Sequence, residues 1–449
     1  PLLAGGSPRA LSMAAGRSAR VQGAVALVLL IASGVLAVTA QGLVSGFALL
    51  GSMLIGAALA LPLILDRVLA VAEGLAKGVR AQWFWADTRQ QLPGLSLALA
   101  ALLLAMAANV GVSTMVSSFR LTFTGFLDQR LASELYVTAT DPAQAAQMVD
   151  YARPRVRAIL PIQSAPAQIA GFPAEVFGAR DDATYRDNWT FLTSIAAPWD
   201  AVVSGDGILI NEQLSRRSGL SLGDTVTLGG RDFAVAGVYG DYGNPIGQAI
   251  LTETAFKALY PKIEPLRFGL RMPADDVPAL VAALERDVGI PAANTINQAG
   301  IKRFSLDIFD RTFTVTTALN ILTLTVAGFA ILMSLLTLAA LRVPQLAPAW
   351  AMGLTRRELG LLELIRAVLL AVLTALVALP LGLALAWALL AVVNVAAFGW
   401  RLPMYLFPLD YLRLGGFALL AAALAALWPA WRLARTPPSD LLKVFSNER

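Results

Sequence analysis

The chain has 449 residues, of which 57% are hydrophobic and 14% are charged, and its formal net charge is +5. A soluble domain carries about 25% charged residues, so much of this chain is expected to lie in lipid. The sequence contains no cysteine and no histidine, which excludes a disulfide framework, a cysteine-ligated zinc and a histidine general base. The absence of both residue types makes the chain poorly equipped for catalysis, so we expect a protein that is not an enzyme. No phosphate-binding Gly-x-x-x-x-Gly-Lys-Ser/Thr sequence is present, so any ATPase is expected to be another chain. Its basic residues flank apolar runs, which indicates membrane topology and not a nucleic-acid surface.

The N-terminal part of the sequence predicts a hairpin of two transmembrane helices. Residues 1–20 carry three arginines and are expected to be cytoplasmic. Two apolar runs within residues 21–65, joined by Gln41-Gly42, are long enough to cross a bilayer as helices. Residue 1 is Pro and no cleavable signal peptide precedes the first run, so we expect the chain to begin part-way through a longer protein.

The next segment, residues 66–94, is mixed in polarity. Its apolar residues recur at helical spacing while its charged residues face elsewhere, which predicts an amphipathic cytoplasmic linker on the membrane surface. A simple connector between spans is the alternative. Pro93 and Gly94 are expected to turn the chain into a third transmembrane helix over residues 95–118, which carry no charge.

Residues 119–313 are soluble in character, and their length predicts one periplasmic domain with its own core. Two strand-then-helix units lie near its ends. In the first, apolar residues alternate over residues 135–139 and a helix begins at Asp141-Pro142. In the second, alternation over residues 266–272 is followed by a helix. The long insert between the units predicts a split α+β arrangement.

The insert predicts a small β module. Residues 207–210 form an apolar strand, and Asn211 can cap a short helix that ends at Gly219. Residues 225–239 predict a hairpin whose turn is a Gly-Gly pair. The acidic residues of the domain lack the spacing of a calcium loop, so no metal site is expected.

Both ends of the domain carry helices whose apolar stripe continues beyond the bilayer. A helix that keeps an apolar face outside the membrane needs a partner, so we expect the two segments to pair as a stalk. The stalk residues are Phe119, Phe123 and Phe126 on one side, and Ile301, Phe304 and Ile308 on the other.

Residues 314–449 predict three further transmembrane helices and a cytoplasmic tail, which gives about six spans with both chain ends inside. This layout satisfies the positive-inside rule at every short loop. The intramembrane amides Asn109 and Asn320 are interpreted as partners in interhelical hydrogen bonds, with contact to a substrate as the alternative.

A short basic segment from Arg342 to Arg366 separates two of these apolar runs and is expected at the cytoplasmic face. Within it, Thr355 can cap a helix that begins at the next residue, and Glu358 at the third helical position can close a capping box. Glu363 and Arg366 lie three apart and can pair on one helix face. A purely structural pair and a coupling role are both open.

Three stretches resemble the FtsX-like permease family of ABC systems. Residues 342–363 are similar to its basic turn and arginine-rich coupling helix, and residues 428–442 resemble its Pro-Ala-Arg-rich ending. Residues 208–239 are similar to a stretch of MacB-type periplasmic core domains. The two extra spans at the start resemble duplicated members with about ten spans, of which this chain would be the C-terminal half.

The resemblance implies a permease subunit of the bacterial inner membrane, with residues 314–449 as the permease core. A separate cytoplasmic ABC ATPase would bind ATP, this chain would bind no cofactor, and ATP hydrolysis would move the periplasmic domain (mechanotransmission) to export or extract a lipid, lipoprotein or peptide. Further implied partners are an N-terminal permease half or a second permease copy, a periplasmic protein and membrane lipids, without nucleic acid. The residues implied in ATPase coupling are Gly353, Leu354, Thr355, Arg356, Arg357, Glu358 and Glu363.

Other interpretations are compatible with the same sequence. The arginines near residue 356 could be ordinary positive-inside residues. A non-transporting signalling or scaffold protein that regulates a periplasmic hydrolase is the alternative from another class. A secondary transporter is a third, and it would need polar or broken spans near the middle of the membrane.

Overall fold

The computed structural model describes residues 8–242, 244, 246–351 and 353–435, and it divides into two compact units. The helical unit contains the described residues within Pro1–Ser118, Phe313–Ala396 and Met404–Arg449. The mixed unit contains those within Phe119–Thr312 and Ala397–Pro403. The predicted tail at residues 436–449 and the first seven residues of the predicted cytoplasmic segment lie outside the described residues.

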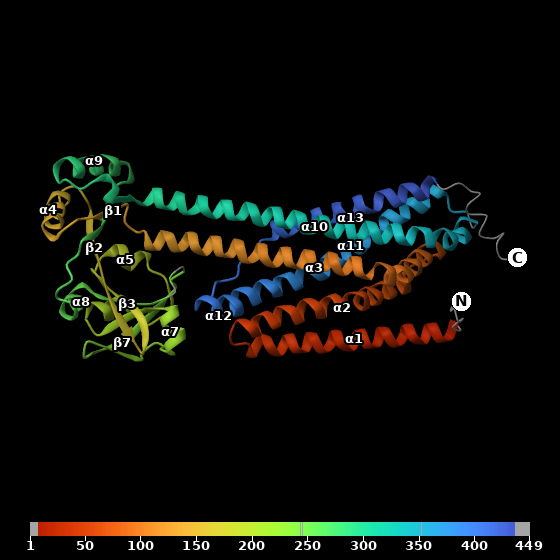
Figure 1. Cartoon of the computed structure of the whole chain (residues 1–449), viewed down its shortest axis with the longest axis horizontal. Coiled ribbons are helices and arrows are strands. Elements are labelled where there is room, and N and C mark those ends of the chain that lie inside the picture. Colours follow the sequence, from red (N-terminus) through yellow and green to blue (C-terminus); the bar gives the residue numbers. More distant parts are fainter. Residues whose placement is uncertain (1–7, 243, 245, 352, 436–449) are drawn as a thin grey trace, which may run out of the picture. The chain divides into compact units, whose positions relative to one another are not determined.

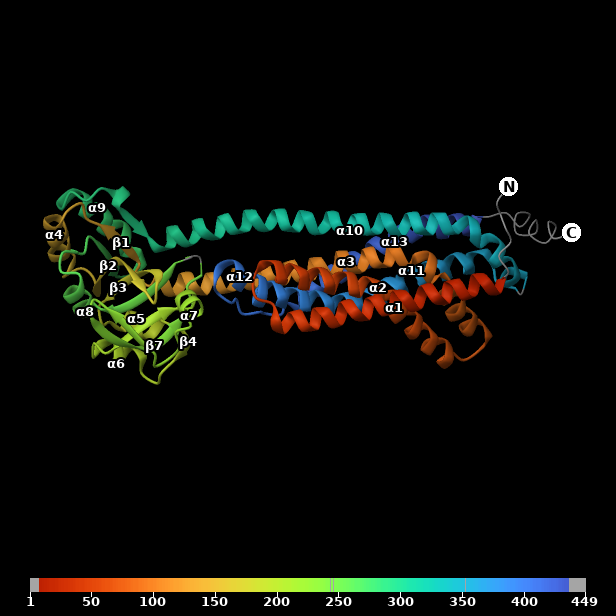
Figure 2. The same cartoon turned by 60° about the horizontal axis from the view of Figure 1, so that its bottom comes forward.

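Six helices among the described residues are long and apolar enough to cross a membrane, which confirms the predicted number of spans. After Ala388, where the fifth of these helices ends, the chain continues through a π-helical turn, Leu389–Val393, into α12 (Asn394–Phe398). The start of the first helix and the end of the last lie at the same end of the helical unit, as an even number of crossings requires (Figures 1 and 2). The six helices are α1 (Pro8–Thr39), α2 (Leu43–Leu75), α3 (Val79–Arg130), α10 (Gln298–Ala351), α11 (Arg356–Ala388) and α13 (Pro408–Arg435).

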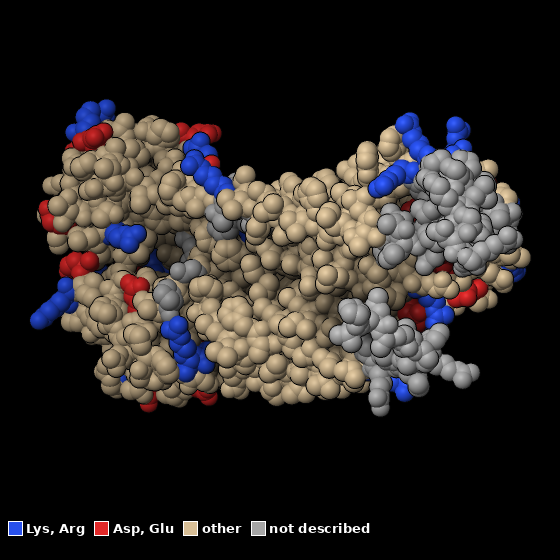
Figure 3. Space-filling model, turned by 45° about the vertical axis from the view of Figure 1, so that its right-hand side comes forward, with Lys and Arg blue, Asp and Glu red and all other residues tan. Residues whose placement is uncertain are grey.

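The surface of the helical unit matches this assignment. On the face drawn in Figure 3, a broad stretch of the surface shows uncharged residues only, and the charged side chains gather away from it. The interior is built from leucines of α2 and α3 and from small residues of α11 and α13, such as Ala371, Ala378, Ala422 and Ala426. Small residues let helix backbones approach closely, which is how helices associate in lipid.

The closest approach of this kind is between α3 and α11. A Cβ atom placed on Gly382 of α11 would lie 2.6 Å from Cβ of Val110 and 2.9 Å from the carbonyl oxygen of Ala107, both on α3. On the α3 side, a Cβ on Gly111 would lie 3.0 Å from Cβ of Leu385. The two glycines therefore set the distance between these helices.

The predicted linker over residues 66–94 is wrong in its bounds. Pro93 and Gly94 do not turn the chain, because α3 runs unbroken from Val79 past both of them. The turn lies at residues 76–78, where Gly78 has φ of +91°. Proline is tolerated inside helices of the membrane because neighbouring groups satisfy the backbone that it frees. Leu69 and Leu92, near the two ends of the segment, are buried in the core of the helical unit and do not face lipid headgroups.

The turn-rich segment expected after Arg342 is also shorter than predicted. Helix α10 continues to Ala351, past Pro344 and Pro348. The connection to α11 is therefore confined to residues 352–355, of which residue 352 lies outside the described part of the chain.

The mixed unit is organised around one sheet, which has ten strands among the described residues. Their order is β10-β1-β9-β2-β3-β8-β5-β7-β4, and β6 pairs with β7. The strands are β1 (Leu135–Thr138), β2 (Ala158–Ile169), β3 (Phe172–Ala179), β4 (Phe191–Ser194), β5 (Gly207–Asn211), β6 (Thr225–Leu228), β7 (Arg231–Tyr239), β8 (Gly247–Thr252), β9 (Arg267–Arg271) and β10 (Thr295–Asn297). The helices are α4 (Pro142–Ala152), α5 (Ala183–Asn188), α6 (Pro198–Val203), α7 (Glu212–Ser218), α8 (Glu253–Leu259) and α9 (Val277–Asp287).

Strand β2 joins the two parts of this sheet. Its first half, Ala158 to Ile162, pairs with β9, and its second half, Gln163 to Ile169, pairs with β3. Beside the first half, α4 and α9 pack their apolar faces on β1 and β9 (Figure 1). Beside the second half, β5 to β8 form a separate core with α7 and α8. The predicted α+β domain with split strand-helix units and a β module is confirmed.

The local signals of the domain are confirmed as well. The side chain of Asp141 accepts a hydrogen bond from Gln144 N at 2.8 Å and caps α4. Asn211 accepts one from Leu214 N at 3.0 Å and caps α7, which ends at Gly219 with φ of +78°. No structure was predicted for β2, β3 and β8, which supply the middle of the sheet, or for β4 and β10 at its two edges.

The end of α3 and the start of α10 are tied together within the mixed unit. Strands β1 and β10, which follow and precede these helices, pair antiparallel with Leu135 opposite Asn297. Gln298 N donates to the carbonyl oxygen of Glu134 at 3.0 Å, and the side-chain amide of Gln298 donates to the carbonyl oxygen of Leu131. The two predicted stalk segments are thus neighbours at the sheet.

The aromatic stripe on α3 is half-buried. The rings of Phe119 and Phe123 stack with centroids 5.9 Å apart, and Phe126 packs edge-on against Tyr242 at 5.8 Å. On α10, Phe304 is 67% exposed and Ile308 is 50% exposed, whereas Ile301 is half-buried. The expectation that all six stalk residues bury one another is therefore wrong for Phe304.

Candidate functional site

The turn between α10 and α11 carries most of the residues singled out by the sequence. Gly353 has φ of +100°, a conformation that glycine adopts at little cost and other residues rarely adopt. Thr355 then caps α11, since its Oγ1 accepts a hydrogen bond from Glu358 N at 3.2 Å. The Glu358 carboxylate returns to accept one from Thr355 N at 2.7 Å. The predicted capping box and helix start are confirmed.

The first turn of α11 presents charge outward and anchors itself through apolar residues. Arg357 and Glu358 are exposed, Leu354 and Arg356 are half-buried, and Leu359 is buried. The negative Glu358 also complements the partial positive charge of the helix N-terminus. The result is a short, fixed, charged surface that a second protein can bind.

Two turns further along α11, Arg366 lies in the interior of the helical unit. It is 2% exposed, and its guanidinium uses all three nitrogens. Nη1 donates to Glu363 Oε2 at 2.8 Å, Nε donates to Thr88 Oγ1 at 3.0 Å, and Nη2 donates to Asp87 Oδ2. The predicted Glu363–Arg366 pair is confirmed, and it belongs to a larger cluster that joins α11 to α3. We call Asp87, Thr88, Glu363 and Arg366 the buried ionic cluster.

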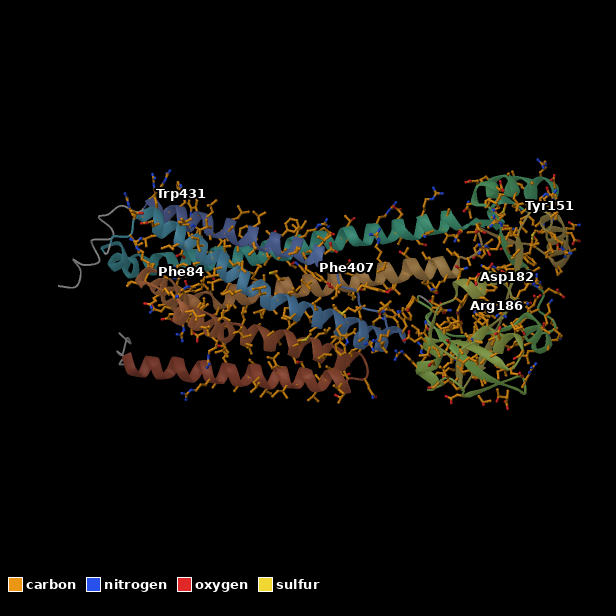
Figure 4. The ribbon with its side chains drawn as sticks, turned by 180° about the vertical axis from the view of Figure 1, so that it is seen from behind. Phe84, Tyr151, Asp182, Arg186, Phe407 and Trp431 are labelled. Carbon is orange, nitrogen blue, oxygen red and sulfur yellow. The ribbon has the colours of Figure 1, made fainter. Side chains whose placement is uncertain are left out.

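Two neighbours on α3 complete the surroundings of the cluster. Gln91 Nε2 donates to Asp87 Oδ2 at 3.0 Å, so this carboxylate has an amide donor as well as the guanidinium. The ring of Phe84 lies 5.5 Å from the Arg366 guanidinium carbon, within the range of a cation–π contact. Phe84 lies toward the same end of the helical unit as Trp431 (Figure 4).

The buried ionic cluster connects α11 to α3 in one particular arrangement, for electrostatic reasons. Charges buried in a low-dielectric interior are costly, and that cost is offset only when partners and hydrogen bonds have good geometry. Arg366 satisfies both carboxylates at once, so a rotation or slide of α11 on α3 would leave one charge without its partner. The cluster therefore favours one register of the two helices.

A second connection lies at the same end of α3. Arg89 forms a two-pronged ion pair with Asp66 of α2, with N–O distances of 2.6 and 3.3 Å, and approaches Glu73 at 3.6 Å. These side chains are partly exposed, so the pair contributes at most about 1 kcal/mol to stability. It links α2 to α3 as the buried ionic cluster links α11 to α3.

The intramembrane amides are brought together as predicted. Asn109 Nδ2 donates to the carbonyl oxygen of Asn320 at 3.2 Å, and Asn109 Oδ1 accepts from Thr323 Oγ1 at 3.1 Å. Asn320 Nδ2 donates to Ser113 Oγ at 3.1 Å. These bonds join α3 to α10 and confirm the interhelical interpretation.

Phe84, Asp87 and Thr88 were not predicted as site residues. They lie in the segment assigned to a surface linker, and 279 positions separate Asp87 from Arg366. The one available signal was an acidic residue among apolar and aromatic neighbours, which is a weak one. Among the described residues, no group of three or more acidic side chains is placed to hold a metal ion.

Comparison with known families identifies two regions of the chain. Residues 317–438 match the model of the FtsX-like permease C-terminal domain. Residues 95–292 match the model of the MacB-like periplasmic core domain.

Individual proteins give the following similarities. An uncharacterised ABC transporter permease protein of Mycobacterium tuberculosis is 31% identical over 434 residues, covering 88% of this chain and 49% of that protein. The chain thus spans about half the length of this relative. The periplasmic region of MacB from Actinobacillus actinomycetemcomitans is 12% identical, over 38% of this chain and 94% of that one, with a TM-score of 0.29. The extracellular domain of the ABC-type transporter YknZ from Gram-positive bacteria is 14% identical, over 37% and 98%, with a TM-score of 0.27.

Proposed function

We propose that the chain is a permease of the FtsX-like family of ABC transporters and that it couples a separate cytoplasmic ATPase to movement of its MacB-like periplasmic domain. In this proposal the ATPase binds and hydrolyses ATP, and this chain transmits the resulting motion. The proposed location is the bacterial inner membrane, with the turn before α11 on the cytoplasmic side.

The observation that carries the proposal is the structure of α11 and its contact with α3. Its first turn is fixed by a capping box and exposes Arg357 and Glu358, which suits contact with another protein. The same helix is tied to α3 at Arg366 and Asp87. Because a helix is stiff over a few turns, displacement of the exposed turn moves the buried ionic cluster with it. Helix α3 then continues as one helix to Arg130, shortly before β1 of the periplasmic domain begins at Leu135.

The buried polar side chains of the helical unit favour transmission of motion by its helices over passage of a polar solute. Among the described residues, the charged and amide side chains buried there are Gln91, Asn109, Glu363 and Arg366, and each makes a hydrogen bond to a neighbouring helix or to a residue one turn away. Ionisable groups that serve a polar pathway usually face a water-filled cavity. We propose a lipid, a lipoprotein or a peptide as the substrate, and a second permease half or copy as the membrane partner.

The proposal is tested by reversing charge at the exposed turn. The variant Arg356→Glu/Arg357→Glu should lose co-purification of the ABC ATPase with the full-length chain. A matched control is Arg67→Glu/Lys77→Glu, which changes net charge equally at exposed positions near the α2–α3 turn. Both variants should fold, since surface substitutions usually cost within about 0.5 kcal/mol. Equal ATPase recovery with both variants would refute the assigned contact.

A further inference from the structure

The chain between α12 and α13 belongs in part to the mixed unit. Ala397–Pro403 is grouped with the sheet and its helices, whereas the residues directly before and after it belong to the helical unit. We call Ala397–Pro403 the strap. The chain therefore passes between its two units here as well as along α3 and α10. The coupling proposed above makes no use of this further connection.

Helix α7 of the mixed unit binds the backbone of the strap. Arg401 N donates a hydrogen bond to Glu212 Oε1 at 3.1 Å. The same oxygen accepts one from Arg216 Nε at 2.7 Å, one turn along α7. Glu212 is 4% exposed, and a buried carboxylate is costly unless it accepts hydrogen bonds. Release of the strap would remove one of its donors, so the buried charge favours the bound strap.

The side chains of the strap are buried as well. Trp400 and Leu402 are both buried, and the Trp400 ring stacks on Phe398 with centroids 5.0 Å apart. Gly399, between the two rings in sequence, has φ of +83°. A Cβ placed on it would lie 3.7 Å from Cγ of Gln213 on α7, so the strap backbone lies against this helix. Loops that only connect two helices usually stay at the surface, so a buried tryptophan and a buried leucine indicate a docked segment.

Buried amide side chains fix α7 to the rest of the mixed unit. Asn211 Oδ1 accepts from Leu214 N at 3.0 Å, at the start of α7, and from Gln248 N of β8 at 2.9 Å. Gln213 Nε2 donates to the carbonyl oxygen of Asn244, just before β8, at 2.9 Å. A displacement of α7 is therefore passed on to β8 and its neighbours in the sheet.

The chain beyond the strap is anchored in the helical unit. Tyr405 N donates to Ser118 Oγ at 3.1 Å, and the Tyr411 hydroxyl lies 3.0 Å from Thr114 Oγ1. Both partners lie on α3. The chain from Arg401 to Tyr405 can span at most about 14 Å, since an extended chain covers at most about 3.6 Å per residue. The strap therefore has little slack between its bond to α7 and its first bond to α3.

The chain before the strap comes directly from α11. Helix α11 has 33 residues, which span roughly 50 Å at about 1.5 Å per residue, and it runs along the length of the helical unit (Figure 1). It carries the exposed turn with Arg357 at its start, and it leads through the π-helical turn and α12 into the strap. π-helical turns are rare and frequently occur at functional sites. The exposed turn and the strap thus lie at the two ends of one helical stretch.

We propose that the strap is a second transmission contact, through which α11 acts on α7, and so on the sheet, without acting through α3. The inference rests on the proposed function, because the motion of α11 comes from the ATPase. Helix α3 is followed by β1, which packs in one core with α4 and α9, whereas α7 belongs to the core beside the second half of β2. Two helices then act on two parts of the domain, which allows the domain to turn and not only to shift.

The contact is tested first on the full-length chain in lipid nanodiscs, by hydrogen exchange. Glu212→Ala removes the oxygen that accepts from Arg401 N, so the strap amides should exchange at least about tenfold faster than in the unmodified chain. Glu212→Gln keeps an oxygen at this position and should leave the exchange slow. Arg216→Ala, the matched control, removes the other donor to Glu212 Oε1 and should also leave it slow. Equal exchange in Glu212→Ala and the unmodified chain would overturn the contact.

A second variant changes the strap itself. Gly399→Ala places alanine at φ of +83°, which is strained for a residue with a Cβ atom, and should speed exchange of the strap amides in the same way. Gly416→Ala on α13 is its control, because a Cβ there meets nothing within 4 Å. If Glu212→Ala does not fold, this pair of variants decides the question. Equal exchange of the strap in both glycine variants would overturn the contact.

Transmission is measured on the complex of the full-length chain with the ABC ATPase that co-purifies with it. Binding of adenylyl imidodiphosphate, a non-hydrolysable ATP analogue, should change hydrogen exchange in both β1 and α7 of the unmodified chain. In Glu212→Ala the response of β1 should persist while the response of α7 is lost, and co-purification of the ATPase should be unchanged. Arg216→Ala should keep both responses.

The outcomes distinguish this inference from the proposed function. A response of α7 that persists in Glu212→Ala would overturn the strap contact as a route and leave the proposed function intact. Loss of the β1 response in the same variant would show that the strap is no separate route, which also overturns the inference. Absence of both responses in the unmodified complex would refute the proposed function itself, and the inference with it.

Discussion

Arg366 of α11 and Asp87 of α3 form a buried ion pair across 279 positions of sequence. Glu363 lies on the other side of the guanidinium at 2.8 Å, so one cation serves two carboxylates. This arrangement ties the helix that follows the exposed turn to the helix that leads into the periplasmic domain. As a result, the stability of the helical unit and the register of α11 on α3 depend on the same few side-chain atoms.

Replacing Arg366 by Met should destabilise the chain strongly. The change leaves Asp87 and Glu363 buried without their cation, and breaking a buried pair in this way costs about 3–5 kcal/mol. The measurement is the fraction of chain that stays monodisperse after heating in detergent. Arg413→Met, at an exposed arginine of α13, should behave like the unmodified chain.

The combined variant Asp87→Asn/Glu363→Gln/Arg366→Met should recover much of that stability, because no buried charge is left unpaired. ATPase stimulation should still fall, since the register of α11 on α3 is no longer fixed. A triple variant as unstable as Arg366→Met alone would contradict the electrostatic explanation.

Removing the cap of α11 should loosen its first turn. Thr355→Ala deletes the oxygen that accepts from Glu358 N, which typically costs about 0.5–2 kcal/mol of helix stability. Hydrogen exchange of the amides at residues 356–360 should become faster, and stimulation of the ATPase should fall. Thr355→Ser keeps the oxygen and should preserve both. Unchanged exchange in the Ala variant would show that the cap does not hold this turn.

The close crossing of α3 and α11 should not tolerate a methyl group. Gly382→Ala places a Cβ 2.6 Å from Val110, and overpacking of this kind costs about 1–3 kcal/mol. Gly51→Ala on α2 is the control, because a Cβ there meets nothing within 4 Å and alanine favours the helix. Thermal unfolding should separate the two variants in opposite directions. A Gly382→Ala variant as stable as the control would mean that the helices have room to move apart.

The periplasmic domain should lose one stabilising contribution only in strong acid. Hydrogen bonds from Arg286 and from Tyr151, whose hydroxyl donates to Asp287 Oδ2 at 2.6 Å, lower the pKa of Asp287 to about 2 (Tyr151 is labelled in Figure 4). A depressed folded-state pKa stabilises above the unfolded value of about 3.9 and is lost as pH falls toward 2. Asp287→Asn should therefore be less stable than the unmodified chain at pH 7, and the difference should shrink at pH 2.5. A difference that stays constant over this range would exclude the linkage.

The assigned orientation can be read with single cysteines, because the sequence contains none. Cysteine at the exposed position Asp275 should react in intact cells with a thiol reagent that does not cross the inner membrane. Cysteine at Arg357 should react only after the membrane is opened. Labelling of Arg357→Cys from outside would overturn the cytoplasmic assignment of the turn.

The features that the sequence predicted well depend on short spacing. Thr355 and Glu358 lie three residues apart, and so do Glu363 and Arg366, so a helix places each pair together without further information. Asp87 could not be assigned in this way, because its partner is contributed by a distant helix. Pro93 was wrongly predicted to turn the chain for a different reason: proline usually ends helices of soluble proteins, but in a membrane neighbouring groups satisfy the backbone that it frees.

The pairing of strand β2 with both parts of the sheet affects how the periplasmic domain unfolds locally. Strand β2 pairs with β9 over its first five residues and with β3 over the remainder. Neither part of the sheet can therefore fray without disturbing the other. Local opening usually follows units that share few hydrogen bonds with their surroundings. Here the shared strand should make the two cores melt as a single cooperative unit. The amides of Leu160 and Ser164, on either side of the change of partner, should then exchange with solvent at the same slow rate.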